Sequence, residues 1–396
     1  MKKIAAIFSA TILNLIAFDL YAMPQEGVNK AVIYNDDLQN SYNKYLTNDF
    51  VSYIILEDNY SARQNKNKYS NAYALGRLYS NLNLGKNFSV NSYLLLEQNA
   101  SAIDEDTTGN NKLLKHQNVN ISELLLKYQN DNFSLMAGKF IANFGTAWQW
   151  NRALWASPAS NYKQTDKLGF NAIFKAGDLK KTGKYNFGFA VFTNDRKNLD
   201  NPLIGNKSSD NKSDAKPGDT RSLNSYVASL DILFDFAKRE KLSYHLAYMS
   251  LDVNSNAKTI DANQNARQVG YVFGGNYRYP ISDNIDFDQL LEYSLIKNYN
   301  GTAGNDQKYL TASLNTNLYQ NWNITFLAAN FKNIVANFDA SNQTQYELSF
   351  GYQFDKTRFF DSLLLQVGNK TLKTSSKSFS DKTDSVGVMI RYIKRF

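Results

Sequence analysis

The sequence predicts an all-β chain that folds into a transmembrane antiparallel β-barrel, and two observations carry this prediction. From about Phe50 to Phe396 the chain repeats segments of roughly ten residues in which apolar side chains alternate with polar or small ones. The breaks between these segments alternate between short turns and long polar stretches. A period of two indicates strands with one apolar face, and alternating break lengths are typical of bacterial membrane barrels.

The clearest strand is the segment 346–354. Its even-numbered positions are all Tyr, Leu or Phe, whereas its odd-numbered positions are Glu, Ser, Gly and Gln. Such a strand separates hydrocarbon from water. In the segments 50–60, 132–140 and 322–332 the apolar face is ambiguous. Sixteen segments are expected to be strands: 50–60, 70–82, 88–98, 119–129, 132–140, 167–175, 184–194, 223–235, 241–252, 267–280, 284–297, 307–319, 322–332, 344–354, 360–372 and 384–396.

The connections support the barrel independently, because every link from an odd-numbered strand to the next even-numbered one is expected at the external end and should be longer. The longer polar connections are 99–118, 195–222, 253–266 and 333–343. A secreted soluble β-protein would also show alternation and remains the alternative fold. The even length of the segments argues against it.

The N-terminal residues predict export. Two lysines precede an apolar stretch, Ile4–Phe18, which is too short to span a membrane, and Ala22 is the expected last residue of a signal peptide covering 1–22. Residues 23–49 have no clear period. We expect them to form an N-terminal extension, either as a short helix or as an early start to the first strand, ahead of a barrel that covers 50–396.

Composition narrows the function. The chain has no cysteine, which excludes disulfides and cysteine-ligated metal centres. The formal net charge is +8, and Tyr, Phe and Asn are spread evenly. In an exported chain this pattern favours anionic lipid headgroups or anionic solutes as partners, and no nucleic acid is expected.

Residues for metal or catalytic chemistry are sparse. The two histidines, His116 and His245, lie far apart in the strand pattern, so no metal site and no cofactor are expected. Ser243 shares a strand face with His245, but adjacent positions on one face do not make a nucleophile with a positioned base, and no enzymatic function is expected. The acidic run from Asp104 begins like a calcium loop but has Lys115 where a bidentate Glu is required.

The last strand resembles the C-terminal signature of Gram-negative outer-membrane proteins. Phe396, Tyr392, Ile390 and Val388 match the alternation of that signature, and Lys394 departs from it. The resemblance implies that the barrel-assembly machinery recognises this strand. Together with the signal segment and the strand pattern, the chain looks like a general diffusion porin of the sixteen-stranded kind.

That resemblance implies passive diffusion of small hydrophilic solutes across the outer membrane of a Gram-negative bacterium. It also implies contacts with outer-membrane lipid and lipopolysaccharide, and assembly into a homotrimer. In such porins the loop after the fifth strand folds inward and narrows the pore. The matching stretch here is 140–166, which is entered through the glycine and aromatic residues of 138–145.

Three of the four tryptophans fall in this loop, which indicates that it packs against something. Because no Asp or Glu lies between Lys139 and Thr165, either the constriction is cationic and favours anions, or this loop is not the constriction. The candidate constriction residues are Trp148, Trp150, Trp155, Arg152, Lys163 and Asp166.

Charged residues on the polar strand faces are candidates for the lumen wall, although any water-filled barrel has such residues. They are Arg77, Glu97, Glu123, Lys127, Arg278, Asp286, Asp288, Glu292, Glu347 and Arg391. Two other functions stay open. The chain could be a substrate-specific channel in which the loop tryptophans stack on sugars, or a surface adhesin whose external loops bind a partner.

Overall fold

The computed structural model describes residues 46–62, 69–98, 112–114, 117–179, 181–194, 202–204, 217–220, 222–237, 240–253, 266–319, 321–335, 339–355, 357 and 359–395. Several expectations lie outside these residues: the signal peptide, the extension up to residue 45, the acidic run from Asp104 with Lys115, His116 and the terminal Phe396.

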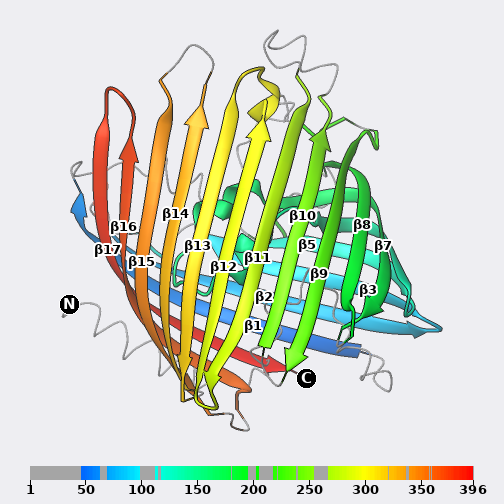
Figure 1. The fold of residues 1–396 in the computed structure, drawn as a ribbon, viewed down its shortest axis with the longest axis horizontal. Helices are drawn as coiled ribbons and strands as arrows, with labels where there is room; N and C mark the ends of the chain where they lie inside the picture. Colours follow the sequence, from blue (N-terminus) through cyan, green and yellow to red (C-terminus); the bar gives the residue numbers. More distant parts are fainter. Residues whose placement is uncertain are drawn as a thin grey trace.

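Sixteen long strands form one closed antiparallel barrel (Figure 1). They are β1 (Leu46–Ala62), β2 (Ser70–Gly85), β3 (Phe88–Gln98), β5 (Gln117–Gln129), β6 (Phe133–Ala142), β7 (Gln164–Asp178), β8 (Gly183–Asn194), β9 (Ser225–Ala237), β10 (Glu240–Leu251), β11 (Gln268–Ser282), β12 (Ile285–Lys297), β13 (Asp306–Leu318), β14 (Trp322–Ile334), β15 (Ser341–Phe354), β16 (Ser362–Ser375) and β17 (Ser380–Arg395). The prediction of sixteen strands is confirmed. The first strand begins at Leu46, four residues before the expected start.

The ring closes because β1 pairs with both β2 and β17. Tyr53 of β1 lies opposite Leu75 on one side and opposite Arg391 on the other. The two-residue strand β4 (Lys112–Leu113) pairs in parallel with β2, while β3 pairs directly with β5, so β4 is not needed to complete the ring. A closed barrel leaves no unpaired edge, which allows a sheet to sit in a bilayer.

Alternation along each strand separates an outer apolar face from an inner face. On β12, Glu292 is 1% exposed and points inward, whereas its neighbours Leu291 and Tyr293 are 56% and 43% exposed on the outside. Large exposed apolar side chains recur on the outer face of most strands. This is the surface that hydrocarbon covers in a transmembrane barrel. Among the described residues, no helix is long and apolar enough to cross a membrane.

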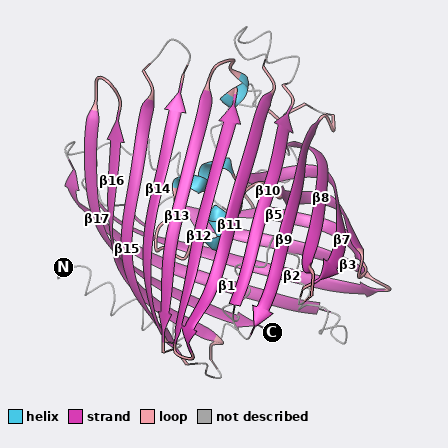
Figure 2. Ribbon diagram, in the orientation of Figure 1, coloured by secondary structure: helices cyan, strands magenta, loops and turns pink. Residues whose placement is uncertain are grey.

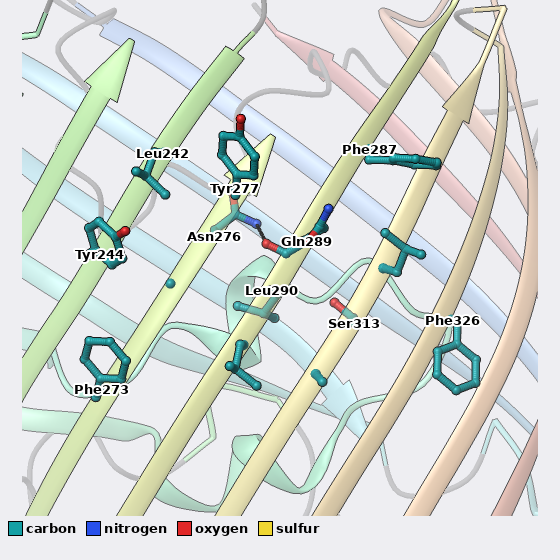
Figure 3. Close-up of a pocket in the computed structure, with 14 residues that line it drawn as sticks. Leu242, Tyr244, Phe273, Asn276, Tyr277, Phe287, Gln289, Leu290, Ser313 and Phe326 are labelled. Carbon is teal, nitrogen blue, oxygen red and sulfur yellow. Dashed lines mark hydrogen bonds between the residues drawn. The ribbon is translucent and has the colours of Figure 1, made fainter. Parts of the chain in front are cut away.

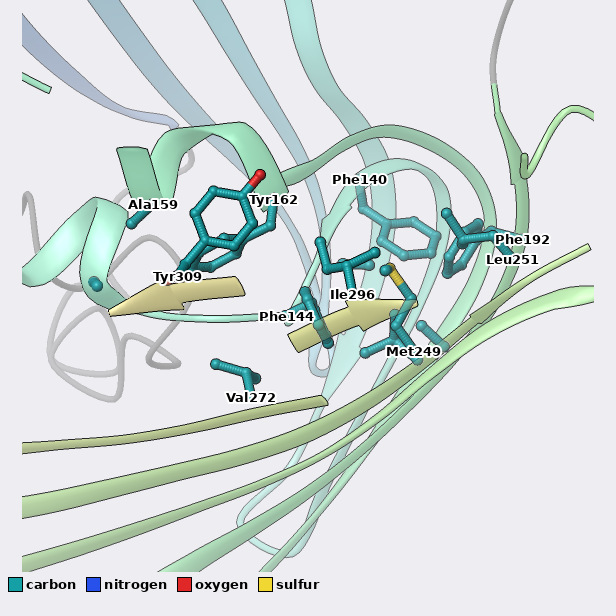
Figure 4. Packing of buried hydrophobic residues seen from close by; sticks show 14 of the residues in the cluster. Phe140, Phe144, Ala159, Tyr162, Phe192, Met249, Leu251, Val272, Ile296 and Tyr309 are labelled. Atoms are coloured by element: carbon teal, nitrogen blue, oxygen red, sulfur yellow. The ribbon is translucent and has the colours of Figure 1, made fainter. Parts of the chain in front are cut away.

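Parts of the inner face are apolar and carry a packed core. One cluster joins Phe144 and Tyr162, from the connection between β6 and β7, to Met249, Ile296 and Tyr309 of the wall (Figure 4). A second cluster joins Leu154 and Trp155 to side chains of β1, β16 and β17. The interior therefore resembles a protein core where this connection touches the wall.

Candidate pore constriction

The connection between β6 and β7 lies against the inner face of the barrel. It contains α3 (Ala147–Trp150) and η4 (Pro158–Tyr162), which Figure 2 shows behind the front strands. Its residues are held by inward side chains of β9, β10, β12, β15 and β16. We call residues 143–163 the lumen loop, because these contacts place it across the interior.

Glu292 of β12 fixes the start of α3. Its carboxylate accepts hydrogen bonds from the backbone N–H groups of Thr146 (2.7 Å) and Ala147 (3.0 Å), and from the Thr146 hydroxyl (2.7 Å). The hydroxyl of Tyr162 donates to the same carboxylate and ties η4 to α3. A buried carboxylate needs several donors to offset its lost hydration. The charge of Glu292 therefore faces the lumen loop and not the open pore.

Glu347 of β15 holds the middle of the lumen loop in the same way. Its two oxygens accept the backbone N–H groups of Leu154 (2.5 Å) and Trp155 (3.2 Å), and its exposed fraction is 1%. Gln366 of β16 donates from Nε2 to the carbonyl of Arg152 (3.3 Å). Two neighbouring strands thus fix the backbone from 152 to 155.

A fully buried histidine fixes the entry of the lumen loop. Nε2 of His245 accepts the N–H of Gly145 (3.1 Å), and Nδ1 lies 2.7 Å from Oδ1 of Asp231. The other oxygen of Asp231 accepts a hydrogen bond from Nδ2 of Asn143 (2.8 Å). Nε2 thus holds the loop directly, and Nδ1 contacts the carboxylate of Asp231 that binds Asn143. Across the described part of the chain, no three His, Asp or Glu side chains converge to hold a metal ion.

The three loop tryptophans differ in their surroundings. Trp148 is partly buried, and its Nε1 donates to the carbonyl of Gly145 (2.9 Å). Trp150 and Trp155 are 6% and 4% exposed. The ring of Trp155 lies against Gly387 of β17, where an added Cβ would come within 2.5 Å of it. Because two of the three indoles are buried in packing, they do not form an open surface for stacking sugars.

The charged residues of the candidate constriction form separate pairs. Nε of Arg152 lies 3.1 Å from a carboxylate oxygen of Asp288 on β12. Asp166 pairs with Nζ of Lys139 (2.8 Å), next to the point where the loop leaves β6. Lys163 follows η4, and burial lowers the pKa of its ammonium group. The Arg152 pair joins the lumen loop to the wall, whereas the Asp166 pair closes the base of the loop.

Three guanidinium groups converge near β1. Arg77 of β2 lies over the ring of Tyr53, with Cζ 5.4 Å from the ring centroid, and Arg391 of β17 is opposite Tyr53 in register. Arg391 is close enough to Arg77 and Arg152 to feel their charges. The Nε atoms of Arg77 and Arg391 are buried without a hydrogen-bond partner. We call Arg77, Arg391 and Arg152 the arginine cluster.

The other predicted wall residues also lie on the inner side but play different parts. Glu97 accepts a hydrogen bond from the side chain of its neighbour Asn120 (3.0 Å), and Glu123 accepts one from a backbone N–H near the loop entry (3.3 Å). Lys127 lies on the same strand as Glu123 and feels its charge. Arg278 and Asp286 lie near the short turn between β11 and β12. Lys127, Arg278 and Asp286 form none of the hydrogen bonds described above that anchor the lumen loop.

Several inward residues that hold the loop were missed by sequence reasoning. Asp231 lies at an inward position of β9, and His245 was considered only as a catalytic or metal residue. Lys370 lies over the ring of Trp155, 4.8 Å from its centroid, and pairs with Glu57 (2.5 Å). The alternation of side chains along each strand could have predicted that these residues point into the barrel. It could not have predicted that they contact the lumen loop.

The predicted assembly strand is β17. Ile390 and Tyr392 alternate with the inward residues Met389 and Ile393 and therefore point outward. The hydroxyl of Tyr392 donates to the carbonyl of Phe359 (2.8 Å). Recognition of this strand during assembly stays a prediction.

A groove on the barrel surface is separate from the lumen (Figure 3). Outward side chains, among them Tyr244, Phe273, Phe287 and Phe326, surround a gap at Gly275. Because these side chains belong to the apolar outer face, the groove faces hydrocarbon and is not part of a solute path.

Comparison with solved structures finds similar barrels in outer-membrane channels. The outer membrane channel DcaP of Acinetobacter baumannii is 12% identical with a TM-score of 0.49, covering 89% of this chain and 95% of that one. An anion-selective porin from Comamonas acidovorans is 10% identical with a TM-score of 0.48, covering 89% and 99%. OccAB2 of Acinetobacter baumannii is 11% identical with a TM-score of 0.47, covering 89% and 98%. No protein-family model and no curated protein matches the sequence. The function proposed below rests on the residues of this barrel.

Proposed function

We propose that the chain is an outer-membrane porin through which small hydrophilic solutes diffuse passively, with a mild preference for anions. One observation carries the preference: the inward carboxylates of Asp288, Glu292 and Glu347 are bonded to the lumen loop. Among the described residues, by contrast, no carboxylate forms an ion pair with Arg77 or Arg391, and Glu97 acts on Arg77 only at longer range. Fixed positive charge that exceeds the nearby negative charge raises the local concentration of anions in a narrow aqueous path.

The test is the reversal potential of single channels in a salt gradient. The wild-type protein should prefer chloride over potassium, and the double variant Arg77→Gln/Arg391→Gln should lose most of that preference. Arg267→Gln is the matched control, because Arg267 is exposed at the rim and paired with Asp252. A cation preference in the wild-type protein, or an unchanged preference in the double variant, would contradict the proposal.

The alternatives lead to different results in liposome swelling with sugars of graded size. A porin admits sugars according to size alone, whereas a sugar-specific channel favours one sugar over others of equal size. An adhesin whose barrel serves only as a mount admits none. The burial of Trp150 and Trp155 argues against the sugar track.

We also propose that the barrel forms a homotrimer through the outer face of β1 and β2. Small outward residues, Ser52, Ala74, Gly76 and Ser80, lie there between the larger Phe50, Ile54, Leu56 and Leu78, whereas the outer face of later strands carries large aromatic side chains. Small residues at these positions let two barrels approach closely there. Native mass spectrometry of the detergent-solubilised protein measures the assembly directly.

A further inference from the structure

Five lysines lie on the outer face at one end of the barrel. They are Lys297 of β12, Lys308 of β13, Lys332 of β14, Lys373 of β16 and Lys382 of β17, and all five are exposed. Each alternates with inward neighbours and therefore points away from the lumen. We call them the lysine strip. This end carries the long connections, and in outer-membrane barrels the long connections face outside.

Strand register brings members of the strip face to face. Lys308 lies directly opposite Lys332, and Lys373 lies directly opposite Lys382. Lys308 is also opposite Leu295, so Lys297 is its diagonal neighbour. Like charges directly opposite each other on one sheet face destabilise the pairing unless something neutralises them.

The described residues supply little of that neutralisation. Asp384 lies 2.8 Å from Nζ of Lys382 and is close enough to Lys373 to feel its charge, so one carboxylate serves that pair. Asp306 accepts the backbone N–H of Asn298 (3.2 Å). Within the described ranges, no carboxylate forms an ion pair with Lys297, Lys308, Lys332 or Lys373. Nζ of Lys373 lies over the ring of the outward Tyr346, 5.9 Å from its centroid. The strip is therefore a concentration of positive charge on the outer face.

The height of the strip on the barrel matches the edge of the apolar band. Directly below it lie exposed outward side chains such as Tyr293, Leu310, Tyr346 and Val386, each more than 40% exposed. Lysines at this level extend their ammonium groups into the headgroup layer while their stems cover apolar surface.

The strip occupies one side of the barrel. In register with Lys297, the outward positions of β8, β9, β10 and β11 are Val191, Tyr226, Ser250 and Val269. A general requirement for solubility at the rim would spread the lysines around the ring. Their confinement to β12–β17 instead indicates a local anionic partner in the membrane.

We propose that the lysine strip binds the phosphate groups of lipid in the outer leaflet, which in a Gram-negative outer membrane is lipopolysaccharide. A phosphate group carries more than one negative charge and three acceptor oxygens, so one group can accept hydrogen bonds from two facing lysines. The pairs Lys308–Lys332 and Lys373–Lys382 each provide such a binding site for one phosphate group. Binding there would also remove the like-charge repulsion across the strands.

The test is a titration of the full-length, detergent-solubilised protein with lipid A carrying its phosphates, and with enzymatically dephosphorylated lipid A. The variants are Lys308→Gln/Lys332→Gln and Lys373→Gln/Lys382→Gln. Each lysine removed should weaken binding of phosphorylated lipid A by roughly fivefold, so each double variant should bind it roughly twenty-five-fold more weakly. Dephosphorylated lipid A should bind all proteins weakly and equally.

Lys86→Gln/Lys181→Gln is the matched control, because both lysines are exposed in turns at the opposite end of the barrel. Its affinity should equal that of the wild-type protein, and thermal unfolding followed by circular dichroism confirms that each variant is folded. Equal affinity in the strip variants, equal loss in the control, or equal binding of both lipids would overturn the proposal. The proposal would also be overturned if the lysine strip bound inorganic phosphate but the protein did not bind lipid A.

Discussion

The ammonium group of Lys163 lies over the indole ring of Trp148, with Nζ 5.2 Å from the ring centroid. Burial lowers its pKa, because taking the charged form out of water is unfavourable. As pH rises, Lys163 therefore loses its positive charge before exposed lysines do. We predict that anion preference falls as pH rises through this lowered pKa, and that Lys163→Arg keeps the preference, since a guanidinium stays protonated.

Reversal potentials recorded from neutral to alkaline pH measure this effect. Lys181→Arg, at an exposed position outside the lumen, should leave the pH profile of the wild-type protein unchanged. An identical decline in Lys163→Arg would show that another group titrates and would refute the assignment to Lys163.

Inward charges could be predicted residue by residue, but their partners could not. The alternation around Glu292 and Glu347 predicted both on the polar face, and in the structure both are 1% exposed against the lumen loop. That each carboxylate accepts two backbone N–H groups follows from the path of the lumen loop, which no local pattern encodes. The same limit applies to His245, whose role depends on Gly145, a hundred residues earlier.

At the scale of elements, the strands with an ambiguous face are those whose inner side is apolar. On β1, the inward residues Val51, Tyr53 and Ile55 pack in the same cluster as Trp155, so both faces of the strand are apolar. On β6, Met136 and Phe140 pack into the cluster around the lumen loop. Apolar and polar residues alternate along a strand only where its inner face meets water. The missing alternation in these strands therefore indicated that their inner faces contact the lumen loop.

The entry of the lumen loop depends on a glycine. Gly145 has φ +78°, and a Cβ there would come within 2.3 Å of the ring of Tyr162. Gly85 has a similar φ of +82° with nothing within 4 Å of an added Cβ, so it is a matched control for backbone strain alone. We predict that Gly85→Ala lowers the free energy of unfolding by about 1 kcal/mol. Gly145→Ala should cost roughly 1–3 kcal/mol more, because the ring must move.

Equilibrium unfolding in urea gives both values. Tryptophan fluorescence should also change in Gly145→Ala, because a displaced Tyr162 disturbs the cluster that contains Trp150. Equal destabilisation by the two substitutions would mean that the close approach to Tyr162 has no energetic weight.

At the scale of the whole molecule, the wall forms the closed ring, and the lumen loop covers some of the charged side chains that the wall points inward. The barrel is closed by backbone hydrogen bonds alone, so the loop is not required to form the ring. It does cover inward carboxylates of two strands, Asp288 and Glu292 of β12 and Glu347 of β15. In the porin proposed above, the loop would therefore have two effects on the pore: it would narrow the path, and it would change which charges a passing solute meets.

These two effects can be separated by replacing residues 146–162, which include the Thr146 and Tyr162 partners of Glu292, with a short Gly-Ser linker. If the loop acted only by filling space, conductance would rise and ion preference would keep its sign. Because Asp288, Glu292 and Glu347 would lose their loop partners and face water, we predict instead that conductance rises and the preference shifts toward cations. Adding Glu292→Gln/Glu347→Gln to the same variant should reverse that shift without reducing the conductance. Reversal potentials and single-channel currents of the two variants, measured side by side, decide between a steric loop and one that sets the charge of the pore.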